Sequence, residues 1–175
     1  MSTLEELEAR VRRLEDVQAI TRLKHRYFRL LDQHEWDELR DCFTDDVETH
    51  YENSHYCFSS IDDVMRFLSE SLGGLRASGR YGLHLGHHPE IELLGANEAR
   101  GYWTLHAVSL EPENGRVGRQ ESFYTDEYRR VNGEWRISKT GYTGFVTASW
   151  SAADLTAAIG GGSDTRELNA TARRS

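Results

Sequence analysis

Short turn sequences divide the second half of the chain into strand-like segments. The segments span residues 90–94, 99–110, 118–131 and 134–145, and the turns fall at 95–97, at Asn114-Gly115 and at Asn132-Gly133. An Asn-Gly pair between strand-like runs is the strongest local signal of a β-hairpin. Strands of this length coil instead of lying flat. The second half is therefore predicted to form a long, strongly bent antiparallel meander.

The first third of the chain has the periodicity of helices. Apolar residues recur every three or four positions from Leu4 to Leu30, which predicts a long amphipathic helix, either continuous or divided near Glu15-Asp16 into an arm and a domain helix. Its first part, residues 4–14, is a narrow stripe suited to packing on a neighbouring subunit or on its own core. A short helix at 36–43, strands at 47–51 and 55–58, and a helix over 61–72 that ends at Gly73-Gly74 are expected to follow.

Together these segments predict an α+β domain in which a cone-shaped, curved antiparallel sheet cups three N-terminal helices. We expect a single domain over residues 1–148, of which residues 1–15 form a helical arm. Residues 149–175 are rich in Ala, Gly, Ser and Thr, and are expected to form a flexible tail or one ordered by a partner. A bent sheet around helices encloses a conical cavity, which is a natural pocket for a small molecule.

The charge balance and the apolar pattern argue against several classes of partner. Acidic residues outnumber basic ones, 29 to 21, and the formal net charge is −8, which is unfavourable for nucleic acid. No apolar run approaches the roughly 18–20 residues of a membrane span, and the acidic N-terminus does not resemble a signal peptide. Cys42 and Cys57 fit free thiols in a reducing compartment, so we expect a cytoplasmic protein.

Asp32 and a group of histidines are the most unusual polar features. Asp32 follows the long helix, where a carboxylate meets the negative end of the helix dipole, so it is either exposed or paired at the mouth of the core. His84, His87 and His88 fall close together. A metal site, an exposed histidine-rich loop, and a general acid–base histidine held by a carboxylate all fit this group. Tyr27 lies on the core-facing stripe and needs a hydrogen-bond partner there.

Alternation along the predicted strands assigns side chains to two faces. In segment 99–110 the face that carries Trp103 is apolar and is expected to line the cavity, so His106 points outward. In segment 118–131, Ser122, Tyr124 and Asp126 share one face, and the spacing leaves open whether that face is inside. The sequence contains no nucleophile elbow, phosphate-binding glycine loop or dinucleotide fingerprint.

A series of short motifs occurs in a characteristic order along the chain. The motifs are Tyr27-Phe28-Arg29-Leu30-Leu31-Asp32, Trp36-Asp37-Glu38-Leu39, residues 84–91, Gly101-Tyr102-Trp103-Thr104-Leu105, Phe123-Tyr124-Thr125-Asp126 and Gly141-Tyr142. Together they resemble the SnoaL-like branch of the nuclear transport factor 2-like superfamily, which includes dehydratases acting on bile acids and on scytalone. The resemblance spans about residues 4–145. It implies a cone-shaped α+β barrel and an elimination reaction that uses no cofactor and no metal.

The resemblance also implies roles for individual residues. In the dehydratases a histidine held by an aspartate removes a proton from a carbon next to a carbonyl-conjugated system, and these two residues correspond to His84 and Asp32. The tyrosines that hydrogen-bond the carbonyl oxygen correspond to Tyr27 and Tyr51. The expected catalytic residues are thus Tyr27, Asp32 and His84, and the expected substrate-binding residues are Tyr51, His87, Trp103 and Tyr124.

Two departures from the bile-acid dehydratases imply a different substrate. Ala107 stands where those enzymes carry a pocket aspartate, and Gly144 where they carry an arginine. We therefore expect a dehydratase acting on another hydrophobic cyclic or aromatic hydroxy-carbonyl compound. An isomerase, cyclase or retro-aldol lyase using the same pocket, and a non-catalytic small-molecule-binding module, are the alternatives. The N-terminal stripe and the outward-facing Tyr102, His106 and Val108 predict a homo-oligomer, a dimer or trimer.

Overall fold

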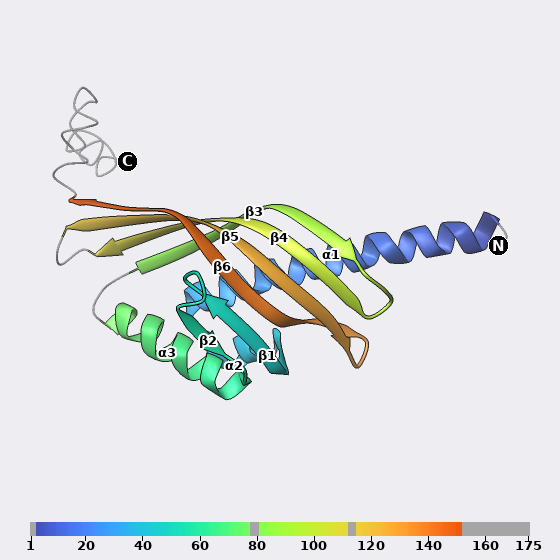
Figure 1. The fold of residues 1–175 in the computed structure, drawn as a ribbon, viewed down its shortest axis with the longest axis horizontal. Coiled ribbons are helices and arrows are strands. Elements are labelled where there is room, and N and C mark those ends of the chain that lie inside the picture. Colours follow the sequence, from blue (N-terminus) through green and yellow to red (C-terminus); the bar gives the residue numbers. More distant parts are fainter. Residues whose placement is uncertain (1–2, 78–80, 112–114, 152–175) are drawn as a thin grey trace, which may run out of the picture.

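The computed structural model describes residues 3–77, 81–111 and 115–151. It contains three helices and six strands (Figure 1). The helices are α1 (Thr3–Gln33), α2 (Trp36–Arg40) and α3 (Ile61–Ala77). The strands are β1 (Phe43–Tyr51), β2 (Tyr56–Phe58), β3 (Tyr81–Leu93), β4 (Glu98–Glu111), β5 (Arg116–Val131) and β6 (Glu134–Ser151). The predicted α+β class and the curved sheet over N-terminal helices are confirmed.

All six strands form one sheet in the order β2-β1-β6-β5-β4-β3. The β3–β4, β4–β5 and β5–β6 pairs form the predicted antiparallel meander. The pairing of β1 with β6 is parallel, so the sheet is mixed and the prediction of a purely antiparallel sheet was wrong in this respect. In Figure 1 the sheet curves over α1, while α3 lies beside β1 and β2. This curvature creates the concave face on which the candidate site lies.

The C-terminal end of α1 positions Asp32. His34 has a φ of 61°, and the Glu35 N–H donates to the Leu30 carbonyl oxygen at 3.0 Å. A residue in the left-handed region followed by this backward hydrogen bond is a common way to end a helix. Asp32 therefore lies in the last turn of α1, with its side chain free to reach across to the sheet.

The histidine group lies in a strand, which begins well before the predicted segment 90–94 and does not fit the interpretation of an exposed loop. Residues 84–89 belong to β3, whose pairing with β4 is interrupted between His87 and Glu90. His88 within this interruption has a φ of 51°, and Pro89 follows it. Because β3 is an edge strand of the sheet, a bulge can accommodate a proline that a central strand would exclude.

Two further boundaries differ from the sequence prediction. Helix α3 continues through Gly73-Gly74 to Ala77, and a Cβ at Gly73 would lie 3.7 Å from the Trp36 ring. Strand β6 extends to Ser151, three residues past the predicted end of the domain, because it pairs with β5 along its whole length. The rest of the predicted tail lies outside the described residues.

Burial along β4 and β5 identifies the inner face of the sheet. Ala99, Trp103 and Leu105 of β4 are buried, as the alternation predicted, and His106 is on the other face. Ser122, Tyr124 and Asp126 of β5 are also buried, which resolves the face that the sequence left open. The inner face of β5 is thus lined by polar groups in a largely apolar core.

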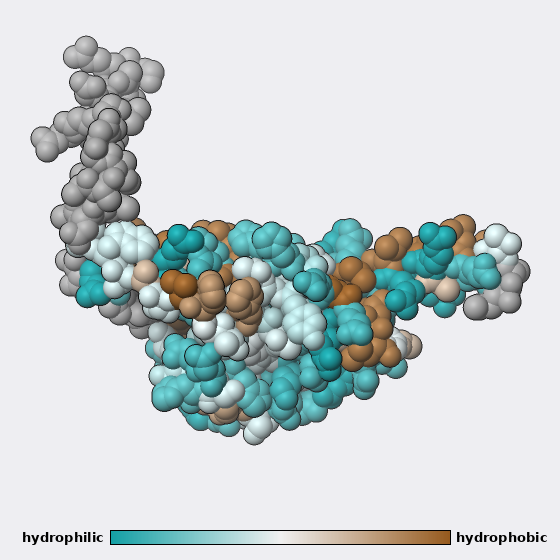
Figure 2. Space-filling view, turned by 45° about the horizontal axis from the view of Figure 1, so that its top comes forward, coloured by the Kyte–Doolittle hydropathy of each residue, from teal (hydrophilic) through white to brown (hydrophobic). Residues whose placement is uncertain are grey.

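The first half of α1 projects beyond the sheet as an arm (Figure 1). Its apolar stripe, Leu4, Leu7, Val11 and Leu14, is 45–71% exposed. Figure 2 shows hydrophobic patches along this arm and where it joins the body of the molecule. Within the described residues, no helix has the length and apolar character needed to cross a membrane.

Candidate active site

Asp32 of α1 and His84 of β3 form a two-point contact between the helix and the sheet. The Asp32 Oδ1 atom lies 2.6 Å from His84 Nδ1, and Asp32 Oδ2 accepts the backbone N–H of His84 at 2.9 Å. A carboxylate at Nδ1 favours the tautomer that carries its proton there, which leaves Nε2 as a free base. The His84 and Asp32 side chains are only 21% and 13% exposed, so water competes weakly for this hydrogen bond.

The Phe28 ring packs against the imidazole on the inner side of the pair. The rings of Phe28 and His84 are nearly parallel, at 5°, with centroids 6.2 Å apart. Gly86, two residues along β3, permits this packing, because a Cβ at that position would lie 2.4 Å from Phe28 Cε2. Phe28 also contacts the rings of Tyr27 and Tyr124. One aromatic side chain therefore contacts both the histidine and the deeper tyrosines.

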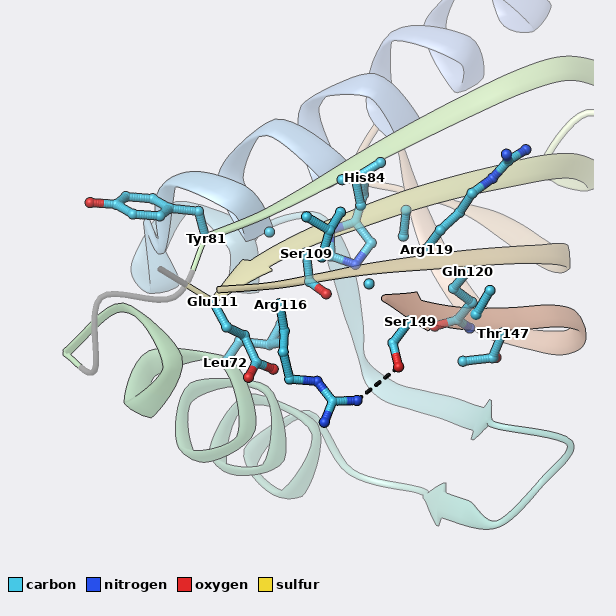
Figure 3. Close-up of a pocket in the computed structure, with 16 residues that line it drawn as sticks. Leu72, Tyr81, His84, Ser109, Glu111, Arg116, Arg119, Gln120, Thr147 and Ser149 are labelled. Atoms are coloured by element: carbon cyan, nitrogen blue, oxygen red, sulfur yellow. Dashed lines mark hydrogen bonds between the residues drawn. The ribbon is translucent and has the colours of Figure 1, made fainter. Parts of the chain in front are cut away.

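A cavity of about 820 Å³ opens next to His84, at the end of the sheet near α3. Figure 3 shows His84 at this cavity, with Arg116 and Ser149 joined by a hydrogen bond of 2.8 Å. The sheet register explains the arrangement, since His84, Ala107, Gln120 and Thr147 form one row across β3 to β6. The cavity wall also includes Leu72, Tyr81, Val108, Ser109, Val117 and Ala148. Glu111, Arg116 and Arg119 line it as well, so the cavity combines apolar surface with charged and polar groups that could orient a small molecule.

The predicted tyrosines lie deeper than the cavity and do not line it. Tyr27, Tyr51 and Tyr124 are 1–3% exposed, and burial raises the pKa of each phenol well above its usual value. The Tyr51 hydroxyl lies near the Tyr27 phenol, yet it makes no hydrogen bond of good geometry among the described residues. A buried, unsatisfied hydroxyl is costly, and it is a donor available to a ligand.

The remaining predicted residues have different surroundings. Trp103 is 2% exposed and its Nε1–H donates to the Tyr128 hydroxyl at 3.0 Å, so it packs beneath the tyrosines and not at the cavity wall. His87 is exposed and its ring contacts His88. His106 lies on the outer face with Glu121, 3.2 Å away. The structure thus brings Asp32 and His84 together at the cavity and leaves His87 outside it.

A buried ion pair beneath the tyrosines was missed by the sequence analysis. Lys24 of α1 and Asp126 of β5 are both fully buried, with Lys24 Nζ 2.8 Å from Asp126 Oδ2. The Tyr128 and Thr140 hydroxyls also donate to Asp126, at 2.7 and 2.6 Å. The ammonium lies 3.8 Å from the centre of the Tyr124 ring. Burial lowers the pKa of Lys24, although Asp126 opposes that shift.

The sequence does contain a signal for this lysine. Lys24 falls on the apolar stripe of α1, four residues after Ile20 and three before Tyr27, where a charged side chain is unexpected. Within the described residues, no group of three or more His, Cys, Asp or Glu side chains is arranged to hold a metal ion.

Comparison with known proteins identifies the family. The SnoaL-like domain matches residues 12–141. A scytalone dehydratase-like protein from Novosphingobium aromaticivorans superposes with a TM-score of 0.71 at 21% identity, over 79% of this chain and 89% of that one. An NTF2-like protein of cystatin-like fold from the same species gives 0.70 at 22%, over 83% and 92%.

A third structure, the hexachlorocyclohexane dehydrochlorinase LinA-type3 from Novosphingobium barchaimii, gives a TM-score of 0.66 at 18% identity, over 85% of this chain and 94% of that one. At such identities the structures establish a shared fold, and the domain match establishes the family. The chain belongs to the SnoaL-like domain family.

Proposed function

We propose that this protein is a lyase that eliminates water from a hydrophobic cyclic or aromatic hydroxy-carbonyl compound without a cofactor. The observation that carries the proposal is the Asp32–His84 pair, with Nδ1 held by the carboxylate at 2.6 Å and the ring at an 820 Å³ cavity. Two of the structural neighbours have names that refer to eliminations, a dehydratase and a dehydrochlorinase. Their identity to this chain is low, so the site geometry is the main support.

The proposed reaction begins with proton transfer to His84. Nε2 removes the proton from the carbon next to the substrate carbonyl, and Asp32 stabilises the imidazolium that forms. The imidazolium then protonates the departing hydroxyl, so water leaves and the histidine returns to its starting state. A positioned acid–base group of this kind contributes about 10²- to 10⁴-fold to the rate.

The tyrosines are proposed to stabilise the enolate. Tyr27 and Tyr51 would donate hydrogen bonds to the carbonyl oxygen as negative charge develops on it. Their raised pKa keeps both phenols protonated and able to donate at neutral pH. The Phe28 ring contacts His84, Tyr27 and Tyr124. A substrate that contacts the histidine and the phenols at the same time therefore requires the Phe28 ring to rotate away.

The Asp32–His84 contact also bears on the alternatives. A non-catalytic binding module does not require one fixed tautomer of a histidine. An exposed His84 without a partner would have favoured such a module. An isomerase, a cyclase or a retro-aldol lyase would use the same first proton transfer, so the products distinguish these reactions from dehydration.

A substrate screen tests the proposal. The purified protein is incubated with a panel of cyclic and aromatic hydroxy-carbonyl compounds, and the products are analysed by mass spectrometry for loss of water. We expect turnover by the native chain and a loss of about 10²-fold or more in His84→Gln, with His106→Gln unchanged. Turnover that survives His84→Gln would contradict the assigned base. Binding of panel compounds without conversion of any would favour the binding module.

A further inference from the structure

A second group of reactive side chains lies on β1 and β2, away from the cavity. His50 of β1 and Cys57 of β2 are directly opposite each other in the antiparallel ladder, so their side chains share one face. The Cys57 Sγ atom lies 3.5 Å from His50 Nδ1. The carboxylate of Glu48, two residues earlier on the same face, lies 4.0 Å from His50 Nε2. The three residues thus form an ordered thiol–imidazole–carboxylate group, and none of them lines the cavity beside His84.

This order of groups favours a reactive thiol. The thiolate is the nucleophilic form of cysteine, and an adjacent imidazole that accepts the proton increases its population. A carboxylate on the other ring nitrogen stabilises the resulting imidazolium. The Ser54 carbonyl, 3.3 Å from Cys57 Sγ, is a competing acceptor that would hold the proton on sulfur. The two acceptors predict different effects of replacing His50: the thiol reacts more slowly if the imidazole takes the proton, and at an unchanged rate if the Ser54 carbonyl holds it.

Access to the sulfur is open on this side of the sheet. Cys57 is exposed, and two of its contacts, His50 and Ser54, line a groove of about 180 Å³. Lys139 and Glu127 line the same groove, and Lys139 pairs with Glu48 at 3.1 Å, so charges of both signs surround it. A small polar molecule can therefore reach the exposed sulfur from this side.

The other cysteine provides an internal contrast. Cys42 is fully buried, and burial raises its pKa to about 11. Its Sγ lies 3.8 Å from the Glu38 carbonyl oxygen, with no imidazole among the contacts of that sulfur in the described residues. The chain therefore contains an exposed thiol beside an imidazole, Cys57, and a buried thiol with a raised pKa, Cys42, which serves as the comparison.

We propose that Cys57 is a site of reversible mixed-disulfide formation with a low-molecular-weight disulfide of the glutathione type. The Cys57 thiol proton passes to His50, and the thiolate attacks one sulfur of the reagent. The reagent S–S bond breaks as the bond to Cys57 forms, and the leaving thiolate takes the proton from His50. The disulfide is the oxidant, and the exchange needs no other reactant. This inference is independent of the proposed lyase activity.

The test measures the rate of modification of each cysteine in the native protein. Oxidised glutathione is the probe, and intact mass with peptide mapping follows each site over about pH 6 to 9. We expect Cys57 to react at least about tenfold faster than Cys42, and His50→Gln to lower the Cys57 rate about tenfold near pH 7. Glu48→Gln is expected to lower it less, since that carboxylate does not contact the sulfur; Lys139→Met, which breaks the other ion pair of Glu48, is its control.

Matched variants separate activation from simple exposure. His55→Gln changes another histidine near the same turn, which contacts Tyr56 and not Cys57, and should leave the rate unchanged. Cys57→Ser should abolish modification in the folded chain. Unaltered Cys57 reactivity in folded His50→Gln would overturn the proposal and assign the proton to Ser54. Equal rates at Cys42 and Cys57 would overturn it as well. If His50→Gln does not fold, Glu48→Gln and the pH profile of the native protein decide the matter.

Discussion

Both carboxylate oxygens of Asp32 bind the same residue: Oδ1 contacts the His84 imidazole at 2.6 Å, and Oδ2 accepts the His84 backbone N–H at 2.9 Å. The backbone bond fixes the distance between α1 and β3 at this point, and the side-chain bond fixes the ring. A carboxylate at the negative end of a helix is unfavourable, and the two hydrogen bonds from His84 offset that cost at Asp32.

Asp32→Asn separates these two effects. The amide oxygen can still accept the backbone N–H, but it no longer stabilises an imidazolium. We expect the turnover of a compound found in the screen to fall about 10²- to 10⁴-fold while the fold is retained. Nitrogen-15 NMR of His84 should show the Nδ1–H tautomer in the native protein and a shift toward the other tautomer in the variant. An unchanged tautomer with unchanged turnover would show that Asp32 does not orient the base.

Gly86 is expected to be required for the packing of Phe28 against His84. An alanine there would place its Cβ 2.4 Å from Phe28 Cε2, so Gly86→Ala should destabilise the fold by about 1–3 kcal/mol. A Cβ at Gly82, on the same strand, would have no heavy atom within 4 Å, so Gly82→Ala provides the control. Urea unfolding of the two variants measures the difference. Equal stability of Gly86→Ala and Gly82→Ala would contradict the packing argument.

The buried Lys24–Asp126 pair should be far more sensitive to disruption than a surface pair. Lys24→Met leaves the Asp126 carboxylate buried without its counterion, so we expect a loss of about 3–5 kcal/mol in the free energy of unfolding. Adding Asp126→Asn to Lys24→Met removes the unpaired carboxylate and should restore part of the lost free energy of unfolding. Lys139→Met breaks the partly exposed pair with Glu48 and should cost about 0–1 kcal/mol. Thermal or chemical denaturation measures both variants. Equal losses in the free energy of unfolding for Lys24→Met and Lys139→Met would contradict the prediction.

The buried tyrosines predict a loss of stability at alkaline pH. The pKa of Tyr27, Tyr51, Tyr124 and Tyr128 is raised by burial, while phenols in the unfolded chain ionise near about pH 10. Above that pH the unfolded state releases protons that the folded state retains, so the free energy of unfolding falls as the pH rises; below it this contribution is fully present. Denaturation midpoints measured at several pH values, with phenolate absorbance as the second readout, test this.

Tyr51→Phe tests the contribution of a single buried phenol to this pH dependence. Its hydroxyl has no hydrogen bond of good geometry among the described residues, so removal should cost little near neutral pH. The same variant should reduce the alkaline decrease in stability, since one buried ionisable group is gone. Ionisation of all tyrosines near pH 10 without unfolding would argue against their burial.

The exposed stripe of the N-terminal arm is expected to pack on a second copy of the chain. Leu7→Glu combined with Val11→Glu places charges on the stripe and should convert the assembly to monomers, as measured by sedimentation velocity over a range of concentrations. Ala9→Glu, about 200° around the helix from Leu7, changes the other side of the arm and should leave association intact. A native protein that sediments as a monomer at all concentrations would exclude this interface.

Much of the fold is encoded in short-range patterns. The 3–4 spacing from Leu4 to Leu30 correctly predicts helix over this segment, and the structure shows one unbroken helix, α1, where the spacing also allowed a break near Glu15-Asp16. The Asn132-Gly133 pair correctly predicts the turn between β5 and β6. Alternation along β4 correctly places Trp103 inside and His106 outside. Each of these features depends on residues a few positions apart, which is why periodicity and turn chemistry suffice.

The misassigned segments depend on distant partners. Residues 84–89 contain glycine and proline, and they form a strand because β4 pairs with them and a bulge at the sheet edge absorbs Pro89. Helix α3 passes Gly73-Gly74, next to the Trp36 ring of α2. The parallel pairing of β1 with β6 joins the two halves of the chain, and no local pattern specifies it.

Short-range periodicity specifies the long helix and the meander, and the motifs that resemble the family indicate Asp32 and His84. The folded molecule alone shows that these two residues touch, that Lys24 pairs with Asp126, and that the tyrosines lie away from the cavity wall. This division arises because helix and strand periodicity is set by near neighbours. Contacts between α1 and the sheet arise only when the strands have paired and curved around the helix.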